Sequence, residues 1–320
     1  MSDFISIDWG TTSLRVSHCT SEGHHTLHTV TTVDGALSVN QRFLAKGDPS
    51  PEARKIFFQE VMASALQQLD LTTDAKVPVL LSGMVSSAIG METLPYARLP
   101  FSLNGSEAVM KGWEAEGQRY CMISGLTTED DLMRGEETQL VGASILAGIG
   151  SEEALFLFPG THAKHVEVRE GMVQGFKTYM TGEVFCQLFS NSILAQSVSV
   201  HHDHSATNTA AFINGVHEGA EGNVLQKMFK VRTAGMFNRM SKEENFSYLS
   251  GMLIGAELKD LKVAPPQRII LCGSGELMQA YEQALKALEL LGNDVNCYVA
   301  DGNTATAIGQ YRICQLSSQL

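Results

Sequence analysis

The stretch Phe4-Ile5-Ser6-Ile7-Asp8-Trp9-Gly10-Thr11-Thr12-Ser13-Leu14-Arg15-Val16 decides the fold of this chain. Apolar residues alternate up to Asp8, a Gly-Thr-Thr turn follows, and a second alternation leads away, which together predict a β-hairpin. Glycine lets the backbone approach a ligand, and turn amides and hydroxyls can donate to phosphate oxygens. The predicted phosphate-binding residues are Gly10, Thr11, Thr12 and Ser13. Asp8, at the strand end, is placed to hold a hydrated Mg²⁺ against the same oxygens. An ordinary tight hairpin is the alternative interpretation.

Length, composition and charge limit the class of protein. A chain of 320 residues has room for two domains, each with its own core. The net charge of −12, with no basic stripe, argues against a nucleic-acid partner. The six scattered cysteines form no C-x-x-C pair and indicate reduced thiols. Without a leader pattern or an apolar run long enough for a bilayer, we expect a cytoplasmic protein with no membrane partner.

The opening hairpin has a counterpart later in the chain. The alternation of residues 22–33 predicts a third antiparallel strand after the first hairpin. From residue 154 the same plan recurs: an apolar strand, the turn Pro159-Gly160-Thr161-His162, a return strand at 166–168 and a third strand at 172–178. The repetition predicts two homologous domains, residues 1–150 and 151–320. A closing helix at 304–313 could pack back on the first domain.

Further elements place polar loops at the ends of strands. A helix is predicted at 52–69, and the apolar run at 77–81 predicts a strand buried on both faces. Its carboxyl end leads into the loop Ser82 to Gly90, the place where open α/β sheets bind ligands. A strand at 120–124 and a buried helix at 140–149 follow, whereas 94–116 carries no clear pattern. Residues 183–262 read as mostly helical, before a strand at 268–272, a helix at 276–291 and a strand at 295–299.

Three glycine-containing turns that each follow a strand resemble the phosphate and adenosine turns of the acetate and sugar kinase, hsp70 and actin superfamily. They lie at residues 8–13, 159–164 and 273–275, and no G-x-x-x-x-G-K-[ST] loop occurs. The resemblance runs from residue 4 to about 313. It implies an α/β fold of two duplicated ribonuclease H-like (actin-like ATPase) domains of mixed sheet plus helices, with an ATP cleft between them. It also implies that Gly273, Ser274 and Gly275 pack on adenosine.

Four motifs narrow the resemblance to the 2-dehydro-3-deoxygalactonokinase family. They are Ile7 to Arg15, Ser82-Gly83-Met84, Arg134-Gly135-Glu136-Glu137-Thr138-Gln139 and Phe158 to His165. The resemblance implies an ATP- and Mg²⁺-dependent kinase of galactonate catabolism. Such an enzyme phosphorylates the terminal 6-hydroxyl of 2-dehydro-3-deoxy-D-galactonate to give 2-dehydro-3-deoxy-6-phosphogalactonate. Its partners are ATP and a small sugar acid, with a homodimer as the default assembly.

The catalytic base is expected where related carbohydrate kinases have a Gly-Asp-Gln segment at the start of a buried helix. Here Gly135-Glu136-Glu137 stands at that place, so glutamate replaces aspartate and two residues compete. The alignment of the glycine favours Glu136, with Glu137 second. In the alternative interpretation both carboxylates only favour the helix N-terminus electrostatically.

The remaining site residues follow from the charges of the two substrates. A substrate carboxylate calls for guanidinium groups, which grip it with two hydrogen bonds, and a sugar acid also needs polar contacts to its hydroxyls. The predicted substrate-binding residues are Arg15, Trp9, Ser82, Gly83, Met84, Ser86 and Arg134. Trp9 would stack on the sugar, unless it is a core residue. The second hairpin is predicted to bind phosphate through Gly160, Thr161, His162 and Lys164. The alternatives are a solvated strand lysine and a hydrogen-bonded turn histidine.

Two other functions are weighed against this one. A related keto-deoxy aldonate or another carbohydrate could be the acceptor, and the sequence does not fix the preferred epimer. A non-enzymatic ATP-binding scaffold or regulator is disfavoured, because the first strand begins at Phe4 and no added module is visible. The run His201-His202-Asp203-His204 is interpreted as a solvated loop rather than a zinc site, because adjacent residues project in different directions.

Overall fold

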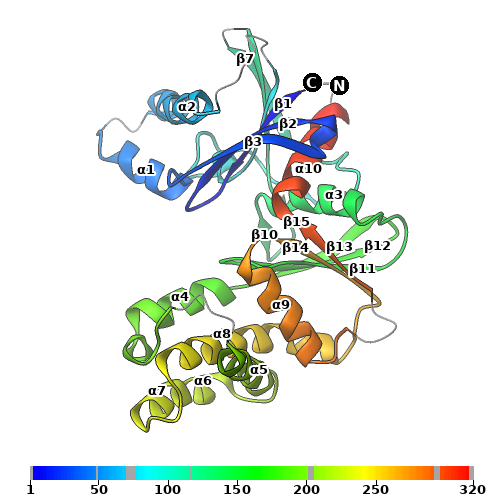
Figure 1. Ribbon diagram of the computed structural model, residues 1–320. Coiled ribbons are helices and arrows are strands. Elements are labelled where there is room, and N and C mark those ends of the chain that lie inside the picture. Colours follow the sequence, from blue (N-terminus) through cyan, green and yellow to red (C-terminus); the bar gives the residue numbers. More distant parts are fainter. Residues whose placement is uncertain are drawn as a thin grey trace. The chain divides into compact units, whose positions relative to one another are not determined.

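The computed structural model describes residues 3–47, 50–69, 77–115, 117–200, 205–291 and 296–316 (Figure 1). The chain divides into two compact units. Unit 1 comprises Met1–Glu152, Val166–Phe176 and Ala300–Leu320, and unit 2 comprises Glu153–His165 and Lys177–Val299. The main division therefore lies just after residue 150, while two later segments belong to unit 1.

The sheet of unit 1 contains the opening hairpin at its centre. Its strand order is β3-β2-β1-β4-β8-β7. The strands are β1 (Phe4–Trp9), β2 (Leu14–Thr20), β3 (His25–Thr32), β4 (Val79–Gly83), β7 (Met110–Ala115) and β8 (Gln118–Ile123). The pair β1–β2 is antiparallel with Asp8 opposite Arg15, whereas β4 lies parallel to β1. The predicted hairpin, third strand and buried fourth strand are thus confirmed, and the strand end at Asp8 lies beside the strand end at Ser82.

Helices cover both faces of this sheet, as Figure 1 shows. On one face lie α1 (Ala36–Leu44) and α2 (Pro51–Gln67), which enclose a core with Ile5, Ile7 and Trp9. The other face carries α3 (Glu136–Leu146) and α10 (Gly302–Leu316). Because strand side chains alternate between faces, Phe4 points the opposite way and packs on Tyr311 of α10, with ring centroids 5.4 Å apart.

The helices α3 and α10 cross at very short range. A Cβ atom on Gly142 would lie 1.8 Å from the carbonyl oxygen of Ala305, and one on Gly309 would lie 1.9 Å from that of Thr138. Only glycine permits such an approach of two backbones. Gln310 of α10 also donates from Nε2 to the backbone oxygen of Ile7 and to Oγ of Ser82. The last helix is therefore an integral part of unit 1.

Three short strands of unit 1 form a second sheet, and one of them, β5, comes from the segment 94–116 that carries no clear sequence pattern. The strands β5 (Ala97–Arg98), β9 (Leu126–Thr127) and β10 (Leu132–Met133) make a small sheet in the order β10-β9-β5. Unit 1 also contains two 3₁₀ turns: η1 (Ser21–Gly23) between β2 and β3, and η2 (Met84–Ser86) directly after β4.

A third sheet contains the second hairpin. Its order is β15-β14-β11-β12-β13-β6, and β11 lies parallel to β14. The strands are β6 (Phe101–Ser102), β11 (Ala154–Phe158), β12 (Ala163–Arg169), β13 (Met172–Tyr179), β14 (Arg268–Gly273) and β15 (Asn296–Asp301). Here too the predicted strands are present, and their alternation is that of the first hairpin.

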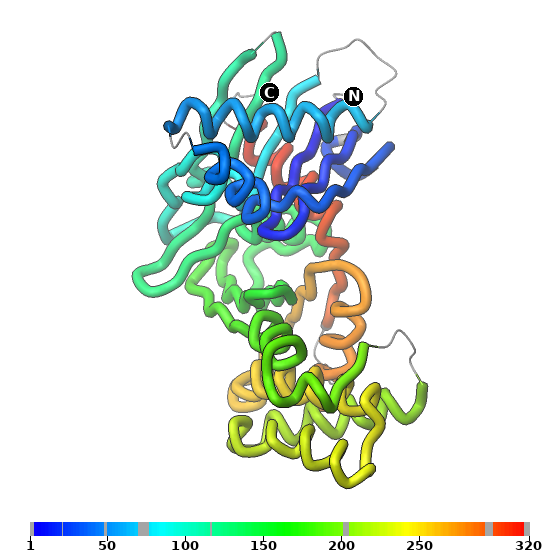
Figure 2. Tube along the Cα trace, turned by 90° about the vertical axis from the view of Figure 1, so that its left-hand side faces the viewer, coloured from blue at the N-terminus to red at the C-terminus, as the bar shows by residue number. Residues whose placement is uncertain are grey.

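The rest of unit 2 is helical, and Figure 2 follows its path from green to orange. The elements are α4 (Thr181–Asn191), η3 (Ile193–Ser197), α5 (Ala206–Ala220), α6 (Val224–Lys227), α7 (Phe229–Met236), α8 (Lys242–Leu258), η4 (Lys259–Lys262) and α9 (Glu276–Ala287). The helices α5 and α8 cross through glycines; a Cβ on Gly219 would lie 1.9 Å from the Met252 oxygen. None of the helices in the described ranges has the length and apolar character needed to cross a membrane.

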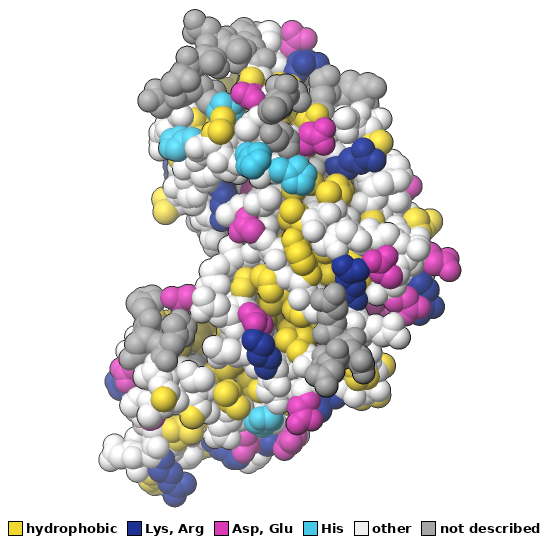
Figure 3. All heavy atoms as spheres, turned by 45° about the vertical axis from the view of Figure 1, so that its right-hand side comes forward, with side chains coloured by type: hydrophobic (Ala, Val, Ile, Leu, Met, Phe, Trp, Pro, Cys, Tyr) yellow, Lys and Arg dark blue, Asp and Glu magenta, His cyan; other side chains and the backbone are white. Residues whose placement is uncertain are grey.

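The charged side chains are mixed rather than sorted by sign. On the face shown in Figure 3, lysine, arginine, aspartate and glutamate side chains of the described residues alternate without a continuous basic stripe. This agrees with the net charge of −12 and gives no electrostatic footprint for a nucleic acid on that face. The run His201 to His204 lies outside the described residues.

Candidate active site

The first hairpin turn is held by the start of α1. The Gly10 amide donates to the Ser13 oxygen at 2.9 Å, and the amides of Ala36 and Leu37 donate to the oxygens of Gly10 and Thr11 at 3.0 and 3.1 Å. A Cβ on Gly35 would meet the Thr12 backbone at 2.2 Å, so glycine is required for this contact. Thr11 and Thr12 nevertheless stay exposed. The turn therefore presents both threonines to solvent from a fixed backbone.

Asp8 lies at the centre of a charged cluster in unit 1. Arg15 Nη1 is 3.1 Å from Asp8 Oδ2, and the two side chains keep 27% and 24% exposure. Burial raises the pKa of Asp8; Arg15 opposes this rise, and the carboxylate of Glu136 adds to it. Glu136 is therefore close enough to act on Asp8 electrostatically. Three charged side chains from β1, β2 and α3 thus share one site.

The cluster suits a magnesium ion that is completed by other ligands. Within the described residues, no group of three or more His, Cys, Asp or Glu side chains could hold a metal by itself. Mg²⁺ is commonly bound through one or two carboxylates together with water and substrate phosphates. Asp8 offers hard oxygen donors that remain partly exposed at the strand end. The donor set therefore fits a hydrated Mg²⁺ that arrives with a nucleotide.

The two adjacent glutamates have different environments. Gly135 has a φ of 110°, which favours glycine, and α3 starts immediately after it. Glu137 is 1% exposed and accepts hydrogen bonds from the Gly135 amide at 2.7 Å and the Thr138 hydroxyl at 2.9 Å. Burial, with a contribution from Glu136, raises the pKa of Glu137 to about 8. Glu137 is thus an internal side chain of this turn.

Glu136, in contrast, is partly exposed. Its Oε2 accepts a hydrogen bond from the Arg134 amide at 3.0 Å. This bond is also what a helix-capping role would produce. Of the two glutamates, only Glu136 combines access with proximity to Asp8. The geometry therefore favours Glu136 for proton transfer.

Arg134 is fixed by its neighbours. Its Nη1 donates to the hydroxyls of Ser86 at 2.6 Å and Ser124 at 3.3 Å, and its guanidinium lies 4.1 Å from the ring centroid of Tyr96. Ser86 itself is fully buried. The structure thus corrects the predicted direct role of Ser86, which orients Arg134 instead of facing a ligand.

Two more predicted substrate contacts prove to be internal. Trp9 is fully buried, donates from Nε1 to the Asp34 oxygen at 2.8 Å and packs on Phe58 at 5.3 Å, so it is a core residue and is not available for stacking. Ser82 is also fully buried, and its Oγ accepts from Gln310. The alternation Ile5-Ile7-Trp9 already placed Trp9 on the buried face.

Gly83 has a backbone role, whereas Met84 keeps its predicted role as a substrate contact. Gly83 allows β4 to approach β1, because a Cβ would lie 2.7 Å from the Trp9 oxygen. Its role is in this close approach, with no side chain to offer a ligand. Met84 is half-buried at the start of η2 and remains a predicted contact.

The second hairpin turn, in unit 2, has the same construction as the first. The Glu183 amide of α4 donates to the Thr161 oxygen at 3.0 Å, and a Cβ on Gly182 would lie 2.4 Å from the Gly160 oxygen. In both turns a helix N-terminus and a glycine support an exposed threonine. Thr161 is exposed, as is His162, whose Nε2 pairs with the Glu183 carboxylate. The same contacts to a helix N-terminus and a glycine at both turns support a common origin of the two hairpins by duplication.

Lys164 is buried, which contradicts only the alternative of a solvated strand lysine. It is 4% exposed, and its Nζ donates to the His162 oxygen at 3.0 Å. It is therefore not a solvated strand residue, and its hydrogen bond to the backbone of His162 stabilises the second hairpin turn.

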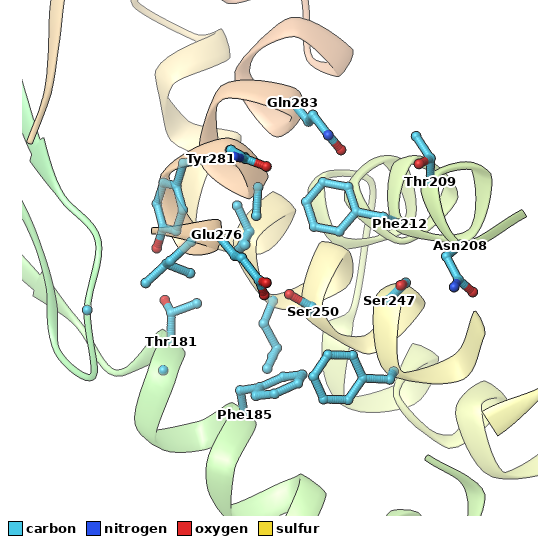
Figure 4. A pocket seen from close by; sticks show the side chains of 18 residues that line it. Thr181, Phe185, Asn208, Thr209, Phe212, Ser247, Ser250, Glu276, Tyr281 and Gln283 are labelled. Atoms are coloured by element: carbon cyan, nitrogen blue, oxygen red, sulfur yellow. The ribbon is translucent and has the colours of Figure 1, made fainter. Parts of the chain in front are cut away.

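A pocket of about 270 Å³ lies among the helices of unit 2 (Figure 4). Phe185 of α4, Phe212 of α5 and Phe246 of α8 give it apolar walls. Figure 4 shows the polar groups of Ser250 and Glu276 turned toward each other across its interior. The other lining residues are Gly160, Thr181, Gly182, Asn208, Thr209, Ser247, Leu253, Ile254, Leu277, Gln279, Ala280, Tyr281 and Gln283.

This pocket contains residues that the sequence did not reveal. The predicted turn Gly273-Ser274-Gly275 leads into α9 but does not line the pocket, whereas Glu276 and Gln279 of α9 do. The spacing of Gln279 and Gln283 places both on one helix face, which is the signal available in the sequence. Gly160 also lines the pocket, so it adjoins the second hairpin turn.

Comparison with known proteins identifies the family. Residues 8–313 match the family described as 2-keto-3-deoxy-galactonokinase. The chain belongs to this family. It is 31% identical over 309 residues to the 2-dehydro-3-deoxygalactonokinase of Escherichia coli strain K12, with 93% of each chain covered. The 2-keto-3-deoxy-galactonokinase family consists of phosphotransferases, and this member is a sugar-acid kinase.

Solved structures agree with this family. A crystal structure from Sinorhizobium meliloti, provisionally named a 2-dehydro-3-deoxygalactonokinase, has a TM-score of 0.79 and 27% identity and covers 99% of this chain and 95% of its own. The activator of the 2-hydroxyisocaproyl-CoA dehydratase from Clostridium difficile, solved with ADPNP, has a TM-score of 0.51 and 10% identity, with 99% and 96% covered. The second likeness concerns the fold alone. The chain has the mixed α/β fold of the Sinorhizobium meliloti structure.

Proposed function

We propose that this kinase transfers the γ-phosphoryl group of MgATP to the terminal 6-hydroxyl of 2-dehydro-3-deoxy-D-galactonate. The product would be 2-dehydro-3-deoxy-6-phosphogalactonate, formed in the cytoplasm during galactonate catabolism. The observation that carries the proposal is the cluster of Asp8, Arg15 and Glu136 in a chain of this family. A carboxylate that can take a proton and one that can hold Mg²⁺ are what phosphoryl transfer to an alcohol requires.

In the proposed reaction, Glu136 accepts the proton of the substrate hydroxyl while the hydroxyl oxygen forms a bond to the γ-phosphorus. The bond between that phosphorus and the bridging oxygen breaks, and ADP leaves with the bond's electron pair. Bound Mg²⁺ would neutralise charge on the phosphate oxygens, with Asp8 holding it through water. Thr11 and Thr12, exposed on a fixed backbone, would donate to phosphate oxygens.

Arginines of unit 1 would hold the substrate carboxylate. Arg134 is oriented by Ser86 and by the Tyr96 ring, and it adjoins the proposed base in the chain. A guanidinium can hold a carboxylate with two parallel hydrogen bonds, which fixes the orientation of the acid. Arg15 is the second candidate, and its contact with Asp8 would also orient that carboxylate.

The nucleotide would be held by unit 2. The pocket among α4, α5, α8 and α9 has aromatic walls and a few polar groups, which is the usual character of a small-molecule site. We assign it to the adenosine part of ATP. Gly160 belongs to both the pocket lining and the second hairpin, so the phosphates would extend toward Thr161 and His162.

An acceptor screen tests this function. The purified protein is incubated with MgATP and single acceptors, and ADP release is measured by a coupled assay. We expect turnover with 2-dehydro-3-deoxy-D-galactonate and a product phosphorylated at carbon 6, identified by phosphorus and carbon NMR. The panel contains the C4 epimer, other keto-deoxy aldonates and neutral hexoses. Higher kcat/KM with a neutral hexose, or phosphate at another carbon, would overturn the proposal.

A further inference from the structure

A single buried carboxylate joins several elements around the pocket of unit 2. Glu257, near the end of α8, is 3% exposed. Its Oε1 lies 2.9 Å from His165 Nε2, while its Oε2 accepts hydrogen bonds from the hydroxyls of Thr181 and of Tyr281, the latter at 2.6 Å. The partners come from β12, α4 and α9. A fully satisfied buried network of this kind fixes the elements that contribute to it.

Two members of the network line the pocket and two lie behind it. Thr181 and Tyr281 line the pocket, and Figure 4 shows their hydroxyl oxygens close together on the same side. Neither Glu257 nor His165 lines it. His165 follows Lys164 in the strand that leaves the second hairpin turn. Thr181 is the first residue of α4, whose start supports that turn through Gly182 and Glu183.

We propose that Glu257 is a positioning residue for the nucleotide: it holds the start of α4 and the inner face of α9 at the separation that ATP requires. This inference rests on the proposed assignment of the pocket to ATP. Glu257 touches no substrate. It acts through the Thr181 and Tyr281 hydroxyls, which its Oε2 binds together.

The chemistry of the network requires a carboxylate. An ionised carboxylate only accepts hydrogen bonds, and here it receives three donors. Burial, together with the nearby Glu257 charge, raises the pKa of Tyr281 well above its ordinary value, so the phenol stays protonated and donates. A glutamine in place of Glu257 has the same shape but presents an N–H pair on one side. That group would face either the imidazole, which would have to exchange its tautomer to accept from it, or the two hydroxyls, which would have to turn their protons away, so the network is weakened on one side.

The test compares two variants that lie outside the pocket. Glu257→Gln and His165→Asn both disturb the network, while the pocket lining keeps its residues. Affinity for a non-hydrolysable ATP analogue is measured by calorimetry with Mg²⁺, and KM for each substrate by steady-state kinetics. We expect the Kd and KM for nucleotide to rise at least fivefold in both variants, with the KM for the sugar acid within twofold. The double variant should cost less than the product of the two single effects, because both break one network.

Glu218→Gln provides a matched control. It makes the same substitution at a hydrogen-bonded glutamate of unit 2, on α5, where Lys227 and Lys230 are the partners. Glu218 does not line the pocket, so the nucleotide Kd should stay within twofold. If Glu257→Gln does not fold, Tyr281→Phe removes one hydrogen bond of the network and keeps the ring, and its nucleotide Kd should rise at least threefold.

Failure of this inference can be told from failure of the proposed function. Ser250→Trp fills the pocket and should abolish nucleotide binding if ATP binds there. Unchanged binding in that variant would refute the pocket assignment. Loss of binding in Ser250→Trp together with normal binding in both Glu257→Gln and His165→Asn would refute only the role of Glu257. An equal rise in the KM of both substrates would also overturn it, since that is the result of a general structural defect.

Discussion

Replacing Glu136 by glutamine tests the assignment of the base. The change keeps the side-chain volume and an oxygen for the Arg134 amide, but the amide cannot accept the substrate proton. General-base catalysis contributes a factor of roughly 10²–10⁴, so kcat should fall by that factor, a rise of about 3–5 kcal/mol in the barrier. Nucleotide affinity should stay equal or improve, because the Glu136 charge, which raises the pKa of Asp8, is removed.

The neighbouring glutamate offers a control of the same chemical size. Glu137→Gln should leave kcat within about threefold, because Glu137 is buried and its raised pKa, about 8, keeps it largely protonated at neutral pH. The Thr138 hydroxyl can accept from the new amide as well as donate, so the local hydrogen bonds survive. The two variants thus make the same substitution at neighbouring positions, of which only Glu136 is accessible to a substrate.

The assay is single-turnover transfer with excess enzyme, which separates chemistry from product release. Calorimetry with an ATP analogue measures binding for the same preparations. A kcat for Glu136→Gln within threefold of the wild type would refute the assignment. Loss of turnover in Glu137→Gln with normal turnover in Glu136→Gln would transfer the role to Glu137. A large loss of nucleotide affinity in Glu136→Gln would contradict the electrostatic reasoning about Asp8.

Three further outcomes follow from the packing and charge of the same elements. The folded state raises the pKa of Glu137 from 4.5 to about 8, so this group's contribution to the free energy of unfolding should be fully present below pH 4.5. The contribution should decline as pH rises toward 8, by at most about 1.4 kcal/mol per pH unit. Urea unfolding from pH 5 to 8 should show this decline for the wild type relative to Glu137→Gln, and parallel curves for the two proteins would contradict it. Gly309→Ala places a Cβ 1.9 Å from a carbonyl oxygen of α3 and should lower the free energy of unfolding by about 2 kcal/mol or more, whereas Gly175→Ala, with open space around it, should change it little. Gly182→Ala should raise the KM for ATP several-fold and leave the KM for the sugar acid unchanged, because its Cβ would meet a carbonyl oxygen of the second hairpin turn at 2.4 Å. An unchanged KM for ATP would show that the start of α4 can shift away from the turn without affecting nucleotide binding.

Local signals in the sequence predicted much of the fold. Period-2 alternation next to a Gly-Thr turn located both hairpins, because these features depend on neighbouring residues only. The same alternation contained the answer for Trp9, which shares a strand face with Ile5 and Ile7 and is buried with them. Of the two interpretations of Trp9, stacking on the sugar and a place in the core, the structure has the second.

The interior of the site depended on contacts that the sequence does not display. The Ser82 hydroxyl accepts a hydrogen bond from Gln310, a residue far along the chain. The sequence shows only that Ser82 lies where a strand leads into a loop, and that position by itself suggests a ligand contact. Glu136 and Glu137 differ because adjacent side chains at the start of α3 point in different directions: Glu137 lies on the helix face of the buried Leu140 and Val141, whereas Glu136 does not. The pocket of unit 2 combines four helices whose apolar faces look alike in sequence, and only their packing shows which side chains are left facing a space.

The position of α10 has a consequence for how the protein is made. A ribosome releases residues 4–146 first, yet one face of their sheet lacks part of its cover until α10 emerges with Tyr311 and Gln310. All residues of unit 2 lie between these two segments in the chain, so unit 2 can fold while Phe4 and its neighbours still expose an apolar surface. The unit whose synthesis begins first is completed last.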